Sequence, residues 1–386
     1  MDLDAFAVRG PGNSLTDVAG VRVGHVTLIS GDGPLVPGRG PVRTGVTAIL
    51  PGEDLYRCKL AAGVHIINGF GKMTGIPQVE EMGRLESPIM LTSTLCTWRV
   101  ADGVADYLLA RHPEIGRTGP TCNIVVAECS DARLNDMRGR HVHAEHAVRA
   151  IEAATDAPVQ EGSVGAGTGM VCYGFKGGIG SASRRGRSEA LGRDVTLAGL
   201  VLANFGRRQF LRIHGCPVGM LAGDAPAGST TTGTHVDDPP RAEDPGRGGS
   251  VIVILATDAP LTSRQLTRIA RRAAAGLART GSVYHNHSGD FVLALSTARA
   301  YPPYLADEGA LLNPFFEAAA DVTEEAVIRA LLQARPMTGR DGYRVDALSA
   351  SRLRAVWHDW HVRSAGATET PWALDLESLV GPRLQE

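Results

Sequence analysis

The sequence predicts a folded α+β protein, and three observations carry this prediction. Of its 386 residues, 43% are hydrophobic and 21% are charged, which is close to the average for globular proteins and excludes a disordered chain. Short β-rich runs, glycine-rich turns and longer helical patterns alternate from residue 13 to about residue 211. After residue 249 the pattern is strand, helix, strand, helix. The length alone leaves one large domain or two domains open.

The first half of the chain contains three predicted strands and two predicted helices. Residues 21–26, 45–50 and 123–127 are short β-rich runs. The third run is continuously apolar, which is typical of a strand buried on both faces. Residues 99–110 and 143–154 have helical patterns, and the second is followed by Thr-Asp-Ala-Pro as a stop signal. We therefore expect helices to cover the faces of a sheet.

A long exposed loop is predicted at residues 223–249. This segment contains six glycines, four prolines and a single large aliphatic side chain, Val236, so it cannot supply a packed core. Structureless loops longer than about 12–15 residues are uncommon inside compact chains, and they tend to be functional segments or linkers. Composition alone leaves both interpretations open.

The chain changes character directly after this loop. Residues 251–256 form an apolar, β-branched run, which predicts a central buried strand with Ser250 at its first position. Thr262 is expected to cap a helix that reaches about residue 277 and keeps most of its arginines in solvent. Residues 291–295 predict a second buried strand. The capping box at 321–324 predicts that another helix begins there and runs to about residue 335.

The balance of charge excludes several classes of partner. Lysine and arginine number 39 against 41 acidic residues, so the net charge is −2 and no overall field would hold the chain on nucleic acid or an anionic membrane. No stretch approaches the roughly 18 consecutive apolar residues of a membrane-spanning helix. The first residues lack the basic and apolar segments of a secretory signal, so we expect a cytoplasmic protein.

Metal and nucleotide sites are not predicted. The six cysteines are scattered without a CxxC pair, so buried free thiols are expected. The glycine-rich run at 162–180 lacks the patterns of phosphate-binding and dinucleotide-binding loops. No serine lies in GxSxG, which excludes the nucleophile elbow of α/β-hydrolases.

The clustered histidines are interpreted as structural or site-lining residues. His141, His143 and His146 are expected at the solvated start of a helix, because flanking arginines would repel a metal cation. His285 and His287 would alternate onto one face of a strand, where site lining or packing is favoured over a metal pair.

The junction between the loop and the central strand suits self-cleavage. A serine hydroxyl can attack the carbonyl carbon that precedes it, giving an ester that water opens, and glycines leave that carbonyl accessible. Cleavage between Gly249 and Ser250 would make Ser250 the first residue of a new chain. Its α-amino group, with an ordinary pKa of about 7.7–8.0, could then act as a base beside its own hydroxyl. Gly-Gly-Ser also ends many ordinary loops, so the junction alone does not decide.

Several motifs in series resemble those of one enzyme family. Residues 248–261 (GGSVIVILATDAPL) and 13–25 (NSLTDVAGVRVGH) look like the self-processing β-peptidyl aminopeptidase and L-aminopeptidase/D-esterase (DmpA-type) family. Further matching segments follow in the family's order at 69–72, 134–136, 161–169 and 201–204. The resemblance covers roughly residues 13–338, and the remaining C-terminal residues match less clearly.

The resemblance implies a four-layer αββα sandwich, like that of N-terminal nucleophile hydrolases but with different connectivity. It implies that residues 1–386 form a single catalytic domain that cleaves itself into an α subunit, 1–249, and a β subunit, 250–386. The α subunit would end in the flexible loop 223–249. Family members typically assemble as tetramers of such α/β pairs. They remove N-terminal residues from small peptides, amides or esters, and some accept β-amino acids or D-residues. No metal or organic cofactor is implied.

The resemblance also assigns roles to individual residues. Ser250 matches the family's nucleophile, and Asn204 matches the asparagine whose amide stabilises the oxyanion. Ser288 and Asp290 fall on a Ser-Gly-acid motif that orients the nucleophile and directs protons, although some relatives have glutamate at the position of Asp290. Glu128 lies where relatives place a carboxylate that faces the ammonium group of the substrate.

Alternatives remain for these residues and for the function. Asn204 could cap or turn a backbone segment, and Glu128 could bind a structural arginine. Ser288 and Asp290 could be turn residues before a strand. Ser130 stands near a tyrosine of some members, so the motifs do not determine substrate preference.

Two other functions are compatible with the same motifs. The nucleophile could serve an ω-amino-acid oligomer hydrolase or an acyltransferase, although self-processing acyltransferases generally use threonine. An unprocessed, non-catalytic binding protein on the same fold is the alternative from another class, and an uncut chain would favour it.

Overall fold

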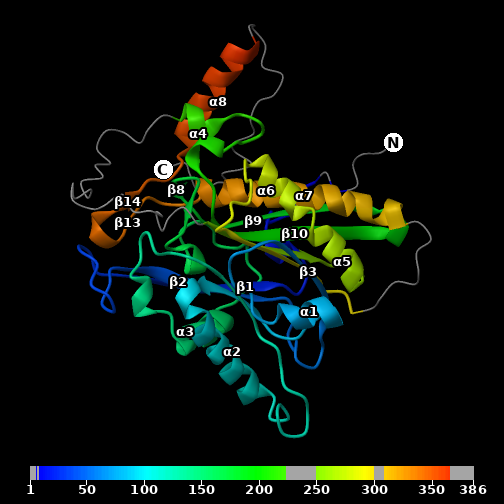
Figure 1. Cartoon of the computed structure of the whole chain (residues 1–386). Helices are drawn as coiled ribbons and strands as arrows, with labels where there is room; N and C mark the ends of the chain where they lie inside the picture. Colours follow the sequence, from blue (N-terminus) through cyan, green and yellow to red (C-terminus); the bar gives the residue numbers. More distant parts are fainter. Residues whose placement is uncertain (1–5, 7, 223–248, 300–307, 366–386) are drawn as a thin grey trace.

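The computed structural model describes Phe6 and residues 8–222, 249–299 and 308–365. The predicted loop at 223–249 lies outside these residues except for Gly249. Figure 1 shows two sheets in the middle of the molecule with helices outside them. None of the described helices is long and apolar enough to cross a membrane.

The two sheets differ in size and lie face to face. The larger has the strand order β4, β3, β12, β11, β10, β9, and the smaller has the order β1, β2, β5, β6. Neighbouring strands are antiparallel except for the parallel pairs β5–β6 and β11–β12. The strand bounds are β1 Arg22–Ser30, β2 Val42–Leu50, β3 Leu60–Gly69, β4 Arg84–Leu85, β5 Ile89–Ser93, β6 Val125–Cys129, β9 Gly178–Ser188, β10 Arg193–Asn204, β11 Ser250–Thr257 and β12 Gly289–Ser296. Two small hairpins consist of β7 Val171–Cys172 with β8 Phe175–Lys176, and β13 Met337–Thr338 with β14 Arg344–Val345.

Helices cover the outer face of each sheet. α5, α6 and α7 lie over the larger sheet, and α2 and α3 lie over the smaller one (Figure 1). The helix bounds are α1 Ile76–Met82, α2 Thr97–Arg111, α3 Ala144–Glu152, α4 Val218–Leu221, α5 Ser263–Ala270, α6 Ala273–Arg279, α7 Glu308–Leu332 and α8 Ala350–Ala365. This order of layers confirms the four-layer αββα sandwich.

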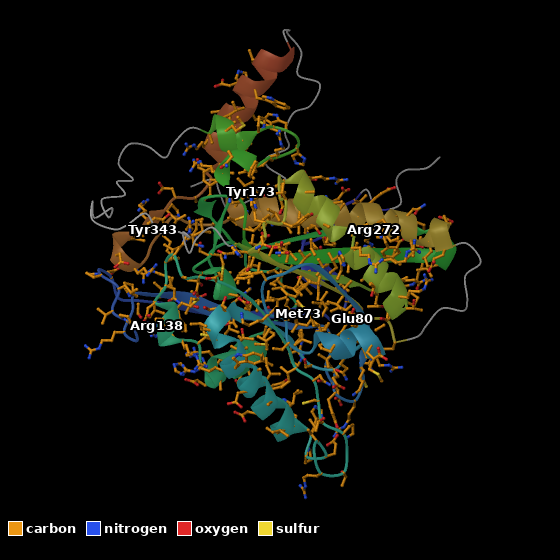
Figure 2. All side chains as sticks on the ribbon, in the orientation of Figure 1. Met73, Glu80, Arg138, Tyr173, Arg272 and Tyr343 are labelled. Atoms are coloured by element: carbon orange, nitrogen blue, oxygen red, sulfur yellow. The ribbon has the colours of Figure 1, made fainter. Side chains whose placement is uncertain are left out.

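Three apolar clusters hold the layers together, and β11 belongs to two of them. Val251 and Val253 pack toward the helices α5–α7, whereas Ile252 and Ile254 pack toward the smaller sheet. Every residue of β11 is buried, which explains why its sequence is continuously apolar instead of alternating. Ser250 shares the face of Ile252, so its side chain lies on the side of the smaller sheet. Figure 2 shows how side chains fill the space between the layers.

The elements predicted in the first half of the chain are confirmed, with shifted ends. β1, β2 and β6 occupy the three predicted strand positions, and α2 and α3 occupy the two helix positions. β6 begins at Val125, two residues later than predicted, and it is buried throughout, as its apolar run indicated. The two strands predicted after the loop are β11 and β12.

Two helix predictions are wrong in part. Thr262 does cap α5 by accepting the backbone N–H of Gln265, but the helix ends at Ala270 and α6 begins separately at Ala273. The capping box predicted at 321–324 lies in the middle of α7, which begins at Glu308.

Tertiary packing explains why the capping box does not start a helix. Thr323 is buried, and its hydroxyl donates to the Ala319 carbonyl one helical turn earlier, at 2.7 Å. Asp321 pairs with Arg279 of α6 at 2.5 Å instead of capping its own backbone. A local capping motif therefore gives way to a helix that continues because its face is buried against β9 and β10.

Some surface predictions also need correction. Arg264 is exposed, as predicted for most arginines of this helix, whereas Arg268 is half-buried, and both pair with Glu308 at the start of α7. His285 and His287 lie in a turn before β12 and not on a strand, and their rings contact Phe210 and Phe70 respectively. Four cysteines are buried free thiols as predicted, but Cys58 is exposed and Cys122 is half-buried.

Candidate active site

Strand register brings Ser250 and Asn204 together. Ser250 is the first residue of β11, and it pairs with Asn204, the last residue of β10. Directly paired residues of neighbouring strands point to the same face, so both side chains lie between the two sheets. Both residues are buried, at 6% and 7% exposure. On its other side Ser250 pairs with Gly289 of β12.

The Ser250 hydroxyl lies against the peptide bond that precedes it. Oγ donates to the Gly249 carbonyl oxygen at 2.7 Å, and the Gly289 N–H donates to the same oxygen at 3.2 Å. A Cβ atom on Gly289 would lie 2.6 Å from the Phe70 carbonyl oxygen and 2.9 Å from Gly71 Cα. Glycine is therefore required at 289 for this close approach, and its backbone N–H faces the Gly249 carbonyl.

The side-chain amide of Asn204 is held at both ends. Its Nδ2 donates to the Ser130 carbonyl oxygen at 2.9 Å, and its Oδ1 accepts the Val171 N–H at 2.9 Å. These partners come from the segment after β6 and from the hairpin β7–β8. Because donor and acceptor ends are both engaged, the orientation of the amide is determined, and Nδ2 has a second hydrogen for another acceptor.

Ser288 and Asp290 form a second pair beside this group. The Ser288 hydroxyl donates to Asp290 Oδ1 at 2.6 Å, and both residues are buried. Asn68 of β3 holds the preceding turn by donating to the carbonyl oxygens of His285, Asn286 and Ser288. Within the described residues, no hydrogen bond joins the Ser288–Asp290 pair to Ser250.

Burial changes the ionisation of Asp290. It raises the pKa of this carboxyl from 3.8 to about 6, and the hydrogen bond from Ser288 opposes the rise. Oδ2 is buried without a hydrogen-bond partner among the residues that the structure describes. Asp290 follows Gly289, the residue paired with Ser250, so a carboxyl that titrates near neutral pH lies one residue beyond that pair.

Glu128 is placed near the same end of the strands. Only 3% of its side chain is exposed, and it accepts from the Lys72 backbone N–H at 2.9 Å and from the Thr94 hydroxyl. Lys72 Nζ pairs with Glu128 Oε1 at 3.3 Å, and the Lys72 side chain is 44% exposed. The position of a Cβ on Gly71 is 3.0 Å from Gly289 Cα and 3.6 Å from Glu128 Oε1, which brings the carboxylate close to the Ser250 group. Among the described residues the cationic partner of Glu128 is a lysine and not the structural arginine of the alternative.

No metal-binding cluster of three or more His, Cys, Asp or Glu side chains occurs in the described part of the chain. His143 is the N-cap of α3 and His146 accepts its backbone N–H at 2.9 Å, so these residues form a helix start as predicted. His141 precedes this helix, and its Nε2 lies 3.0 Å from Oδ2 of Asp136.

Sequence reasoning missed several groups that shape the site. Lys72 lies in the quoted segment 69–72, but its contact with Glu128 requires the loop after β3 to cross the end of β6. Gly289 and Val171 contribute backbone N–H groups, and the residue type at a position does not reveal such a role. Lys176, a single cation inside an apolar and glycine-rich stretch, was a visible signal, and it is fully buried in β8.

Comparison with known proteins places the chain in a family. The model of peptidase family S58 matches residues 13–345. β-Peptidyl aminopeptidase BapA of Sphingosinicella microcystinivorans is 43% identical over 364 residues, covering 90% of this chain and 88% of that protein. The BapA of Sphingosinicella xenopeptidilytica is 40% identical and covers 89% and 86% respectively.

Solved structures agree with this placement. A Pyrococcus horikoshii OT3 protein matches with a TM-score of 0.81 at 46% identity, covering 92% of this chain and 96% of that chain. The L-aminopeptidase D-Ala-esterase/amidase of Ochrobactrum anthropi, described as a prototype of the serine aminopeptidases and a variant of the Ntn hydrolase fold, matches with a TM-score of 0.78 at 37% identity and covers 92% and 95%.

The fold and the relatives together define a hydrolase with an Ntn-type αββα sandwich. More specifically, the chain belongs to peptidase family S58 and is an aminopeptidase of that family.

Proposed function

We propose that the chain is an autoprocessed serine aminopeptidase in which Ser250 first cuts its own chain and then cuts substrates. The observation that carries this proposal is the position of the Ser250 hydroxyl, 2.7 Å from the carbonyl oxygen of Gly249 at the head of a buried central strand. A buried, fixed strand keeps the hydroxyl at the preceding peptide bond, which is the proximity that an intramolecular attack needs.

Self-cleavage proceeds through an ester. Ser250 Oγ attacks the Gly249 carbonyl carbon, the C–N bond breaks, and the Ser250 nitrogen takes the hydroxyl proton and becomes an amine. Negative charge develops on the Gly249 carbonyl oxygen during the attack, and the Gly289 N–H already faces this oxygen. Water then opens the ester and separates residues 1–249 from residues 250–386.

In the mature enzyme the same hydroxyl attacks the substrate. The α-amine of Ser250 accepts the proton of Oγ and passes it to the leaving amine or alcohol. The Asn204 Nδ2 donates to the oxyanion, while Ser288 and Asp290 orient these groups and direct protons. Water hydrolyses the acyl-enzyme ester and restores Ser250.

Glu128 binds the free ammonium of the substrate. A buried carboxylate supports this role, because pairing with an ammonium stabilises a charge that is otherwise shielded from water. Lys72 now pairs with Glu128 and is half in solvent, so a substrate ammonium can displace it without burying the lysine unpaired. The substrates are small peptides, amino-acyl amides or esters. The names of the relatives extend them to β-peptides and D-alanyl esters.

Intact mass tests the proposal. Purified wild-type protein should yield two fragments of about 26 and 14 kDa, in proportion to their lengths, the smaller beginning at Ser250, in place of the 40.6 kDa chain. Ser250→Ala should stay uncut and fail to hydrolyse amino-acyl amides. Normal cleavage of this variant would refute the proposal, and an uncut, inactive wild type would favour a binding protein.

A further inference from the structure

The hairpin β7–β8 places a buried cation beside the partner of Asn204. Lys176 has no exposed surface, and in the hairpin it pairs directly with Val171. The connecting turn consists of Tyr173 and Gly174, whose φ angles of 51° and 70° suit a two-residue hairpin turn. This tight turn fixes β8 against β7 and keeps Lys176 next to the Val171 backbone.

Backbone carbonyl groups surround the Lys176 ammonium. Nζ donates to the carbonyl oxygens of Gly177 at 2.7 Å, Met170 at 2.8 Å and Gly167 at 3.0 Å. In the part of the chain that the structure describes, no carboxylate forms an ion pair with Lys176. Burial lowers the pKa of Lys176 to about 7. The three carbonyl acceptors match the three hydrogens that an ammonium donates, whereas a neutral amine has only two.

A single peptide group connects this cation to Asn204. The carbonyl of the Met170–Val171 peptide accepts from Lys176 Nζ, and the N–H of the same peptide donates to Asn204 Oδ1 at 2.9 Å. Hydrogen bonds in such a chain polarise one another, so the cation strengthens the N–H as a donor. Electron density drawn toward Oδ1 in turn makes Nδ2 of Asn204 a stronger donor.

We infer that Lys176 is a positioning residue for the hydrolytic reaction, acting through the Met170–Val171 peptide to orient and polarise the Asn204 amide. The inference rests on the proposed function of Asn204 as the oxyanion donor. Lys176 itself touches no substrate. Its effect is therefore expected in turnover, where the oxyanion forms, and not in substrate affinity.

A double-mutant cycle on amino-acyl amide hydrolysis tests the coupling. Asn204→Ala alone should lose at least about 100-fold in kcat. Lys176→Met alone should lose about 10-fold or more in kcat with KM within about 2-fold, because its hydrogen bonds and charge reach the reaction only through Asn204. In the Asn204→Ala background, Lys176→Met should change kcat by less than about 2-fold. If the loss in kcat of the double variant equals the product of the two single losses, the residues act independently and the inference is wrong.

Two further variants separate positioning from general damage. Lys176→Gln keeps two N–H donors, so its kcat should lie between that of wild type and that of Lys176→Met. If Lys176→Met fails to fold, Lys176→Gln should still fold and replaces it in the cycle. Arg43→Met removes another buried cation that donates to backbone carbonyls, those of Ser30, Gly31, Val42 and Thr338. Arg43 also pairs with Asp32, and its replacement should leave kcat within about 2-fold. If Arg43→Met lowers kcat as much as Lys176→Met does, the loss reflects the removal of any buried cation, and the inference is wrong.

A structural measurement decides the inference even if the wild type proves inactive and the proposed function fails. In a crystal structure of the uncut Ser250→Ala chain, adding Lys176→Met should break the 2.9 Å hydrogen bond between Val171 N and Asn204 Oδ1 and rotate the amide. An unchanged amide, held by the same two bonds, would overturn the inference.

Discussion

The charge of Asp290 depends strongly on its burial. This residue is 1% exposed, and burial raises its pKa to about 6 from 3.8. The folded chain therefore holds this proton more tightly than the unfolded chain does. The resulting stability is fully present below pH 3.8 and is lost as the pH rises through 6. Above that pH the fold contains a buried carboxylate whose principal support is the Ser288 hydroxyl.

Asp290→Asn tests this ionisation, because the amide cannot take the negative charge. The free energy of unfolding of the parent minus that of the variant should fall by about 3 kcal/mol between pH 3.8 and pH 7, the equivalent of the shift in pKa. Urea unfolding at a series of pH values measures this difference, with Ser250→Ala in both chains to keep them uncut. If this difference does not change with pH, ionisation of Asp290 does not destabilise the folded chain, and the prediction is wrong.

The packing of α7 on β9 depends on the absence of a side chain at Gly180. A Cβ on Gly180 would lie 1.9 Å from the Ala326 carbonyl oxygen and 2.6 Å from the Ala330 nitrogen. These are backbone atoms of a buried helix, so they cannot move aside as the end of a flexible side chain could. Glycine in β9 therefore sets how closely the helical layer approaches the larger sheet.

Gly180→Ala should destabilise the protein by about 1–3 kcal/mol, because the helix must shift away from the sheet. Gly69→Ala is the matched control within the same sheet, since its Cβ would come no closer than 3.8 Å to another atom. Chemical denaturation of both variants in the Ser250→Ala chain measures the effect. Equal stability of the two variants would contradict the packing argument.

The proposed cleavage divides the middle of the larger sheet between two fragments. β11 and β12 would belong to residues 250–386, whereas their neighbours β10 and β3 would belong to residues 1–249. The β10–β11 ladder extends from the pair Asn204–Ser250 to the pair Leu197–Thr257. β11 and β12 are buried on both faces, so separating the fragments would expose a large apolar area.

The two fragments should therefore remain associated after cleavage. Wild-type protein that is cut completely by mass should elute from a size-exclusion column as one species, at the volume of the uncut Ser250→Ala chain. The fragments should separate only at denaturant concentrations that unfold the protein. Elution of free fragments in native buffer would contradict the prediction that the larger sheet holds the fragments together. Assembly into larger oligomers, expected from the family, would appear in the same experiment.

The sequence predicted those elements whose signal is local. Continuous apolar runs predicted β6 and β11 because a strand buried on both faces has no polar side. The start of α7 was missed because a capping box is a four-residue signal, whereas the burial of that helix depends on β9 and β10. The same limit applies to His285 and His287, whose alternation resembled a strand although they lie in a turn.

The α+β class, the buried strand that begins at Ser250 and the family of the chain can be predicted from the sequence, because they depend on local pattern and on motif order. Which groups meet in the site depends on how distant segments pair and pack. Strand register aligns Asn204 with Ser250, and layer packing brings Lys72 to Glu128. Lys176 reaches Asn204 through one peptide group. Such contacts follow from the pairing of distant segments, and a shift of one residue in register would turn each side chain to the opposite face.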